Sequence, residues 1–508
     1  MNSSLIEKPS LRLGSKDEFA RVAGSLRKAG FDEETIQRTL KIESLSDVGS
    51  VKEREVNFSE ASETLEVFIR LFLLQRLVPL STATTVLGRR TLEAFLALGL
   101  LGLGEFGEDQ LYAKVLLYPV AGFLVASDRH SNPDGSHFEP PSDIVFPAIY
   151  AGTLRFLELL PGNECEDALD LCAGSGIGAL VLSRRSKHAV CADITERAAQ
   201  FALFNRELNS LDNVEVVCGD CYAAVEGRTF DSIVAHPPYV PSLNIAAIWR
   251  DGGITGELLV RRIIEGVPQH LRSGGTFCLV TLGLDTAAGT FEERARGWLK
   301  DDAQEFDIIF ASTNERTPQE VLKELCVREE ELGEEGAKRM AAAFQEAGIR
   351  KMPYGALVMR RHAYGEQRQP WTLRVGLSEA TNGQDFDEAF AIRRLLLNPG
   401  FLTSLAGMHP RLAPRLQVIV TYAVHEGELV PAEHIFETDK PFAARGRVDG
   451  WLTPLFARLD GQRSPKEIYD QAQAQSELPD GFALEDLADL IARMIERGFL
   501  VLTEFHQR

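Results

Sequence analysis

Between residues 170 and 178 the chain reads Asp170-Leu-Cys-Ala-Gly174-Ser-Gly176-Ile-Gly178. The run leaves an apolar, strand-like segment and enters a helix-like one. Glycines at such a turn let the backbone bend sharply and approach a ligand closely. The first turn of a helix also offers free N–H groups, which suit a carboxylate or a phosphate. This turn predicts a ligand site, although by itself it fits a dinucleotide equally well.

Strand-like and helix-like patterns alternate around this turn. The expected strands are at 168–172, 189–192, 214–218, 231–235, 276–281, 307–311 and 356–360. Helices are expected at 196–208 and 256–271, and a charged helical insert at 318–347. Such alternation is typical of a doubly wound α/β fold with a parallel sheet. We therefore expect a seven-stranded core over residues 143–363.

The segments on either side of this core have other patterns. Residues 1–142 are mostly helical and end in two short expected strands, 111–117 and 122–127, and a proline-containing linker. Residues 364–445 form a mixed α/β connecting region, and residues 446–508 carry three helices and a short strand. Both terminal modules resemble winged-helix-like domains.

Bulk properties narrow the class of protein. The 508 residues carry a formal net charge of −20, with 44% hydrophobic and 25% charged residues. The negative net charge argues against a nucleic-acid-binding protein, because phosphate groups are bound mainly by Lys and Arg. The seven cysteines are irregularly spaced, which favours a reducing compartment. We see no secretory signal and no apolar run long enough to span a bilayer, so a cytoplasmic protein with no membrane partner is expected.

Polar residues follow three further expected strands. Asp193 ends the second strand, 23 residues after Asp170, a spacing at which a carboxylate can accept both hydroxyls of a ribose. Asp220 ends the third strand, where it can accept a hydrogen bond from an adenine amine. The fourth strand runs into His236-Pro-Pro-Tyr239. In doubly wound sheets, ligands bind at such carboxyl ends.

Together these motifs resemble class I S-adenosylmethionine-dependent methyltransferases, which have a Rossmann-like core. They are most similar to the branch with Asn-Pro-Pro-Tyr after the fourth strand, which includes release-factor glutamine methyltransferases and "small"-domain ribosomal-RNA guanine methyltransferases. The segment Asp251-Gly-Gly, followed by Gly256-Glu-Leu and Arg262-Ile-Ile, is also similar to the glutamine methyltransferases. The resemblance covers residues 143–363.

The resemblance implies S-adenosyl-L-methionine as cofactor and assigns roles to strand-end residues. Asp193 would bind the ribose, and Asp220 with the backbone of Cys221 would bind the adenine. The methionine end would be held by Asp170, Gly174, Gly176 and Gly178. The sequence departs from the family at Cys172, where glycine is usual. We expect this small side chain to be tolerated.

A larger departure is His236, where the family has Asn or Asp. The resemblance makes His236, Pro237 and Tyr239 the catalytic residues. The first two would accept hydrogen bonds from the substrate group that is methylated, and the tyrosine ring would stack on that group. An imidazole with an unperturbed pKa near 6.5 can also act as a general base, worth about 10²–10⁴ in rate. That chemistry suits a hydroxyl, amine or imidazole better than an amide. We therefore predict that release-factor glutamine is not the substrate.

Several alternatives stay open. The acceptor is a nitrogen or oxygen of a protein, peptide or small molecule, with a ribosomal- or transfer-RNA base disfavoured by charge. A non-catalytic S-adenosylmethionine-binding scaffold is the alternative from another class. The terminal modules suit peptide binding, homodimerisation or core packing. We expect no metal at Cys218-x-x-Cys221. Asp128 and Asp143 are expected to be solvated loop acids, with contact to the cofactor as the alternative for either. The histidines at 409, 425 and 434 are expected to be structural.

Overall fold

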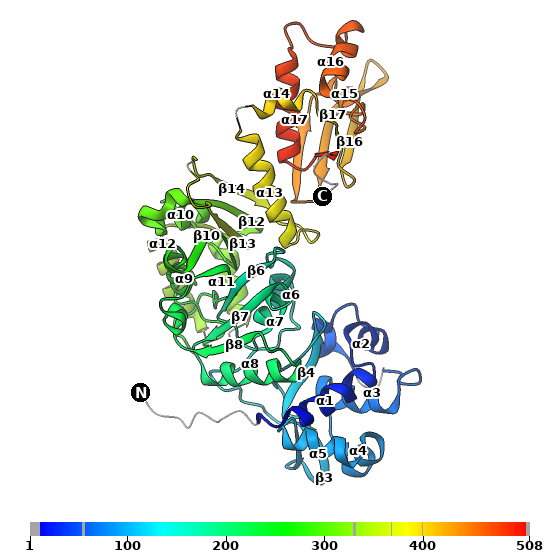
Figure 1. Ribbon diagram of the computed structural model, residues 1–508, viewed down its shortest axis with the longest axis vertical. Coiled ribbons are helices and arrows are strands. Elements are labelled where there is room, and N and C mark those ends of the chain that lie inside the picture. The colour runs from blue at the N-terminus through cyan, green and yellow to red at the C-terminus, as the bar shows by residue number, and fades with distance from the viewer. Residues whose placement is uncertain (1–10, 53–55, 329–331, 367, 399, 504–508) are drawn as a thin grey trace. The chain divides into compact units, whose positions relative to one another are not determined.

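The computed structural model describes residues 11–52, 56–328, 332–366, 368–398 and 400–503 (Figure 1). The chain divides into two compact units. The first comprises residues 1–306, 316–352 and 361–369, and the second comprises residues 307–315, 353–360 and 370–508.

A parallel sheet forms the centre of the first unit. Its strands lie in the order β10-β9-β6-β7-β8. Their bounds are β6 (Cys165–Leu171), β7 (Ser186–Asp193), β8 (Val214–Cys218), β9 (Phe230–Ala235) and β10 (Leu271–Leu282). The helices between them are α7 (Ile177–Leu182), α8 (Glu196–Leu208) and α9 (Leu258–His270). The chain moves outward from β6 to β8 and then returns to β9 beside β6. The gap between β6 and β9 is therefore a topological switch point, where doubly wound sheets bind ligands.

Two long strands run through both units: β12 (Phe306–Arg316) and β13 (Ile349–Arg361). In the second unit β14 (Thr372–Gly376) pairs in parallel with β12. In the first, β11 (Asp285–Thr286) pairs antiparallel with the start of β13. The insert between the long strands is helical, as expected, and contains α11 (Pro318–Arg328) and α12 (Gly333–Glu346). All seven expected strands are present, and the predicted mixed α/β core with a mostly parallel sheet is confirmed.

The N-terminal region has five α-helices and five strands among its described residues. The helices are α1 (Lys16–Lys28), α2 (Glu33–Leu40), α3 (Glu63–Phe68), α4 (Leu80–Leu87) and α5 (Arg89–Ala97). The strands are β1 (Val78–Pro79), β2 (Leu101–Gly104), β3 (Gly107–Ala113), β4 (Val115–Val120) and β5 (Phe123–Asp128). The expected strand at 111–117 is wrong in one respect, since it is divided between β3 and β4. Those two strands belong to different sheets.

This region shares one hydrophobic core with the helices α7 and α8 that flank the parallel sheet, and the core reaches from Leu11 to Leu208. The helix α8 packs against β7 and β8 of the parallel sheet and against β5 of the N-terminal region, and Figure 1 shows it beside β8 and β4. The buried Asn205 on α8 accepts a hydrogen bond from the N–H of Ala126 at 2.7 Å. It donates to the carbonyls of Ala126 and Ser175 at 3.0 and 2.9 Å. Asn205 thus connects the strand β5 with the turn that follows β6. A domain boundary at residue 142 stays a prediction.

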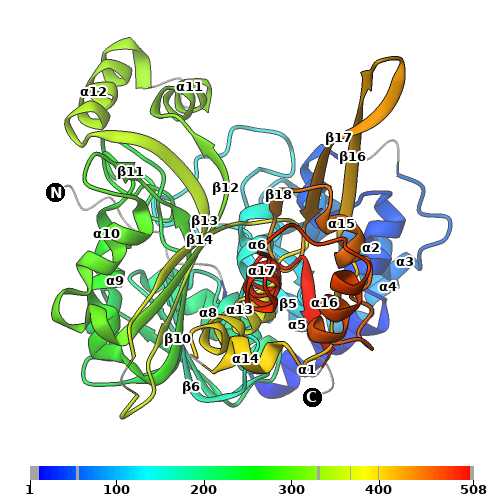
Figure 2. The same cartoon turned by 90° about the horizontal axis from the view of Figure 1, so that it is seen from above.

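The rest of the second unit combines helices with an antiparallel sheet. The sheet order is β16-β17-β18, with bounds Gln417–His425, Glu428–Thr438 and Ala444–Val448. Figure 2 shows the β16–β17 hairpin extending beyond α15 and α16. Within the expected mixed α/β region, the apolar run 416–422 predicts the first of these strands. The second was not predicted, because Pro431 and a bulge opposite Thr421 and Tyr422 interrupt its alternation. The helices are α13 (Gly383–Leu396), α14 (Phe401–Leu405), α15 (Leu452–Phe456), α16 (Pro465–Ala474) and α17 (Leu484–Glu496), and β15 (Pro410–Leu412) pairs with β19 (Leu500–Leu502).

Two further helices of the first unit are α6 (Ala151–Glu158) and α10 (Phe291–Trp298). Among the described residues, none of the helices has the length and apolar character needed to cross a bilayer. The winged-helix-like character of the two terminal modules stays a prediction.

Candidate active site

A cavity of about 890 Å³ lies where β6, β7 and β9 end. Such a volume falls within the range of about 300–1,000 Å³ that is typical of small-molecule sites. Its lining is mostly apolar, with a few convergent polar groups at the strand ends. All of its residues belong to the first unit.

Asp170, at the carboxyl end of β6, is 2% exposed. Its Oδ2 atom accepts a hydrogen bond from the N–H of Ala179 at 2.9 Å, which ties the strand to α7. Burial raises the pKa of this carboxyl group to about 7. A Cβ atom on Gly178 would lie 2.5 Å from the same oxygen, so this glycine is required by the packing of Asp170.

The other two glycines of the turn differ in their surroundings. Gly176 does not line the cavity, and a Cβ there would lie 3.0 Å from the Cβ of Ala202. Gly176 therefore packs against α8, and its contact with the cofactor stays a prediction. Gly174 lines the cavity, and a Cβ there would meet no heavy atom within 4 Å. Of the three glycines, Gly174 is the one at which a ligand can approach the backbone.

Asp193, at the end of β7, connects two loops of the site. Its Oδ2 accepts the N–H of Gly174 at 2.9 Å, and its Oδ1 accepts the N–H of Thr195 at 3.1 Å. Thr195 in turn caps α8, because its Oγ1 accepts the N–H of Ala198 at 3.0 Å. Burial raises the pKa of Asp193. Its neighbour Ile194 is 53% exposed and lines the same cavity.

Asp220 has a partner that the sequence did not reveal. Both of its carboxylate oxygens lie 2.8 Å from Nη1 of Arg262, on α9. Both side chains are about half exposed and line the cavity. Cys221 follows with a positive φ of 55°, and Cys172 has a φ of 57°. Since a positive φ favours glycine, the second value fits the glycine that the resemblance led us to expect at this position.

His236 follows β9 and packs on α6, where its ring stacks on Phe156 at 5.2 Å and 19°. Its Nε2 atom is buried and has no hydrogen-bond partner among the described residues. Burial lowers the pKa of the imidazole to about 4. This differs from the unperturbed pKa near 6.5 that the sequence suggested. The ring is therefore neutral at physiological pH and is a weak proton acceptor that can still accept a hydrogen bond.

The Pro-Pro-Tyr segment after His236 also lines the cavity, and the ring of Tyr239 lies 5.9 Å from the imidazole. A Cβ on Gly256 would lie 2.3 Å from the carbonyl oxygen of Tyr239, so only glycine lets these two backbones approach. This contact gives a physical reason for the glycine at 256.

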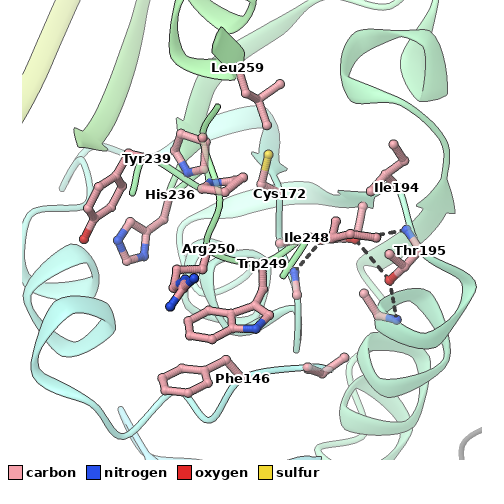
Figure 3. A pocket seen from close by; sticks show the side chains of 18 of the residues that line it. Phe146, Cys172, Ile194, Thr195, His236, Tyr239, Ile248, Trp249, Arg250 and Leu259 are labelled. Carbon is pink, nitrogen blue, oxygen red and sulfur yellow. Dashed lines mark hydrogen bonds between the residues drawn. The ribbon is translucent and has the colours of Figure 1, made fainter. Parts of the chain in front are cut away.

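Three aromatic residues on the rim were missed by sequence reasoning. The ring of Phe146 stacks on Trp249 at 4.2 Å and 5° (Figure 3). It also stacks on Tyr150 at 4.8 Å and 26°. All three line the cavity. Because the first two are far apart in the sequence, no local pattern could have paired them.

The expectation that Asp128 and Asp143 are solvated loop acids is wrong. Arg197, in the first turn of α8, donates to Asp143 from Nε and to Asp128 from Nη1, both at 3.0 Å. The three side chains are only 6%, 14% and 13% exposed, for Arg197, Asp143 and Asp128. Asp128 also accepts the N–H of Val145 at 2.8 Å. The cluster fixes the loop that leads to Phe146.

The cysteine pair that brackets Asp220 is not arranged around a common centre with other ligands. Cys218 is exposed, and its thiol donates to the carbonyl of Ile194 at 3.6 Å. In the part of the chain that the structure describes, no group of three or more His, Cys, Asp or Glu residues is placed to hold a metal ion.

Comparison with known proteins gives a consistent result for the same region. Residues 147–284 match the family model "Methyltransferase small domain". A ribosomal protein uL3 glutamine methyltransferase of Xylella fastidiosa is 33% identical over 147 residues, which is 27% of this chain and 46% of that protein. A release factor glutamine methyltransferase of Thermodesulfovibrio yellowstonii is 31% identical over 133 residues, 24% of this chain and 48% of that protein.

The chain thus spans about half the length of the curated relatives it matches. Solved structures with some similarity include a methyltransferase from Pyrococcus furiosus, at 18% identity over 41% of this chain and 80% of that one, with a TM-score of 0.26. The resemblance to the class I methyltransferases that the strand-end motifs suggested is confirmed over residues 147–284, the segment that carries most of the cavity.

Proposed function

We propose that this chain is an S-adenosylmethionine-dependent methyltransferase that transfers a methyl group to a nitrogen of a protein. The observation that carries the proposal is the buried, unpartnered Nε2 of His236, on a cavity whose wall also contains Gly174 and Asp193. The relatives are named as glutamine methyltransferases of ribosomal protein uL3 and of release factors. These names support a protein nitrogen as the methyl acceptor.

The residues of the cavity fit S-adenosylmethionine. Gly174 borders open space, where the backbone can approach the amino-acid part of the ligand. Asp193 already accepts two backbone N–H groups, and its remaining lone pairs can accept ribose hydroxyls. Ile194 exposes apolar surface next to it, which suits one face of an adenine. Asp220 and the backbone of Cys221 would complete the adenine site.

When bound, S-adenosylmethionine supplies a methyl group on a positively charged sulfonium. In this chain, the acids Asp170, Asp193 and Asp220 lie at the site. Because Arg262 balances the charge of Asp220, Asp193 supplies most of the negative potential that favours a cationic ligand. Asp170 contributes less at neutral pH, because its raised pKa leaves a fraction of it protonated. In our proposal it acts mainly by fixing the turn that carries Gly174.

His236 would position the acceptor. Its Nε2 accepts a hydrogen bond from the acceptor N–H, and the carbonyl of Pro237 accepts a second, which orients the nitrogen lone pair toward the methyl group. With a pKa near 4 the imidazole keeps this acceptor atom unprotonated at physiological pH. It therefore acts as a hydrogen-bond acceptor and not as a strong general base. An amide nitrogen is compatible with this role, so the prediction against release-factor glutamine needs a direct test.

The test has two parts. Titration calorimetry with S-adenosylhomocysteine should detect binding to the wild type and a loss of at least about tenfold in affinity for Asp193→Ala. Incubation with tritiated S-adenosylmethionine and a cell extract should label protein, with His236→Leu abolishing the label while retaining nucleoside binding. A release-factor peptide with its glutamine is included as a defined acceptor.

Each result has a distinct meaning. Label in RNA would replace the protein acceptor with a nucleic acid. Nucleoside binding without label in protein, RNA or small molecules would favour the non-catalytic scaffold. Absence of nucleoside binding would refute the proposal as a whole. Tyr364→Ala serves as a control, because that side chain is 98% exposed and outside the cavity.

A further inference from the structure

We infer that the stacked rings of Phe146, Tyr150 and Trp249, here called the aromatic wall, bind the protein acceptor and select segments with an apolar or aromatic residue beside the methylated nitrogen. The inference rests on the proposed function and deepens it, because it names the kind of segment that enters the cavity.

The aromatic wall is accessible although it is well packed. Trp249 is 38% exposed and Phe146 37%. Two neighbours on the same cavity, Ile245 and Ile248, are 57% and 38% exposed. Contiguous exposed apolar surface of this kind marks binding sites, and aromatic side chains are enriched in protein interfaces. A folded protein gains nothing from leaving these side chains in water, which points to a ligand with apolar surface.

The aromatic wall adjoins the proposed acceptor-orienting residue. Tyr150 is the N-cap residue of α6, the helix whose Phe156 stacks on His236. On the other side, the carbonyl of Arg250 accepts the N–H of Val240 at 2.9 Å, which joins the segment after Tyr239 to the residue after Trp249. Figure 3 shows Trp249 and Phe146 below His236, with Arg250 drawn between His236 and Trp249. An acceptor that reaches His236 would therefore lie close to these rings.

The charges of the cavity favour a protein segment over RNA. Its described lining contains three arginines, and each forms an ion pair: Arg250 with Asp251, Arg261 with Glu265, and Arg262 with Asp220. Exposed aromatic rings can stack on nucleobases, but single-stranded nucleic acid also needs cationic groups along its backbone. Here those groups are already paired with acids.

The aromatic wall is held in place before any ligand binds. Val145, which precedes Phe146, donates its N–H to Asp128, and Asp128 is paired with Arg197. On the other side, Asp251 accepts the N–H groups of Ala246 and Ala247 at 2.9 and 2.8 Å, which fixes the loop that carries Trp249. Pre-organisation of this kind lowers the ordering cost of binding.

The experiment uses the full chain, tritiated S-adenosylmethionine and synthetic peptide libraries centred on Gln, Asn, Lys or His. The positions that flank the central residue are occupied in turn by aromatic, aliphatic, polar or charged residues. We expect about tenfold more transfer to peptides with aromatic or aliphatic flanks. Trp249→Ala should raise the KM for those peptides about tenfold and remove the preference, with the affinity for S-adenosylhomocysteine within about twofold of the wild type.

Two variants control for folding and ring chemistry. Trp249→Phe should restore most of the preference, because it keeps a ring that can stack on Phe146. Tyr364→Ala removes an exposed aromatic side chain elsewhere and should change nothing. If thermal melting shows that Trp249→Ala is unfolded, Ile245→Ser on the same rim replaces it, and the same loss of preference is expected.

Transfer to peptides with no dependence on the flanks would overturn the inference and leave the proposed function standing. So would a Trp249→Ala variant that loses affinity for S-adenosylhomocysteine as strongly as for peptide, since the ring would then serve the nucleoside. Nucleoside binding with transfer to RNA transcripts and to none of the peptides would overturn both, as would nucleoside binding with no transfer at all.

Discussion

The Oδ2 atom of Asp170 lies 2.5 Å from the position that a Cβ atom on Gly178 would occupy. Because Asp170 is buried and bonded to Ala179, it cannot move away without loss of that hydrogen bond. We expect Gly178→Ala to lower the free energy of unfolding by about 1–3 kcal/mol, the usual cost of overpacking, and to weaken S-adenosylhomocysteine binding. Urea unfolding and calorimetry measure the two effects.

Gly24→Ala is the matched control for this substitution. Gly24 lies within α1, and a Cβ there would meet no atom within 4 Å. Alanine is favoured over glycine in a helix by about 1 kcal/mol, so this variant should be as stable as the wild type or more stable. If Gly178→Ala and Gly24→Ala were equally stable, the turn after β6 would accommodate the added methyl group without a loss of stability.

Asp170 also gives the protein a pH-dependent stability. Its pKa is raised from 3.8 to about 7 by burial, so the folded state disfavours the charged form. The stability that this group contributes is full below about pH 4 and is lost as the pH rises toward and through 7. Asp170→Asn keeps an oxygen for the N–H of Ala179 and removes the titration. The stability of Asp170→Asn relative to the wild type should therefore be higher at pH 8 than at pH 5, as measured by urea unfolding at both values. A difference that does not vary with pH would contradict the raised pKa.

The parallel sheet and its strand-end acids were predictable because they depend on local patterns. A strand buried on both faces is a short apolar run, and a residue directly after it lies at the edge of the sheet whatever the rest of the fold does. Asp193 is an example: its position after β7 alone places it beside the turn after β6. The strand β17 was missed because Pro431 interrupts its alternation, although its pairing with β16 tolerates the interruption through a bulge.

Other features of the site depend on contacts between residues far apart in the sequence. Asp128 and Asp143 lie in a polar, proline-rich segment, and only the fold shows that Arg197 pairs with both. The same holds for Phe146 and Trp249. The lowered pKa of His236 depends on burial against Phe156, which the sequence of its own loop does not encode.

The low pKa of His236 predicts the pH dependence of catalysis. The imidazole is neutral above about pH 4, so kcat/KM should have no acid limb near pH 6.5 from this residue. His236→Asn keeps a hydrogen-bond acceptor and should retain measurable transfer with a profile of the same shape between pH 5.5 and 8. His236→Leu keeps no acceptor, and we expect a loss of at least about 10²-fold in kcat/KM. A wild-type limb near pH 6.5 that disappears in His236→Asn would instead identify a general base.

Arg197 stabilises both the fold and the loop that carries Phe146. Its guanidinium pairs with Asp128 and Asp143, and all three side chains are largely buried. Burial already raises the pKa of Asp128. Arg197→Met would leave two buried carboxylates without their cation, and we expect a loss of about 3–5 kcal/mol in the free energy of unfolding. Arg89→Met is the matched control: Arg89 is 86% exposed and pairs with Glu93 at the surface, so its loss should cost less than about 1 kcal/mol. If the Arg197 and Arg89 variants unfold at similar urea concentrations, the cluster contributes little to stability. In that case, adding Asp143→Asn to Arg197→Met should restore none of the free energy of unfolding. If the cluster is stabilising, the same second substitution should restore part of it.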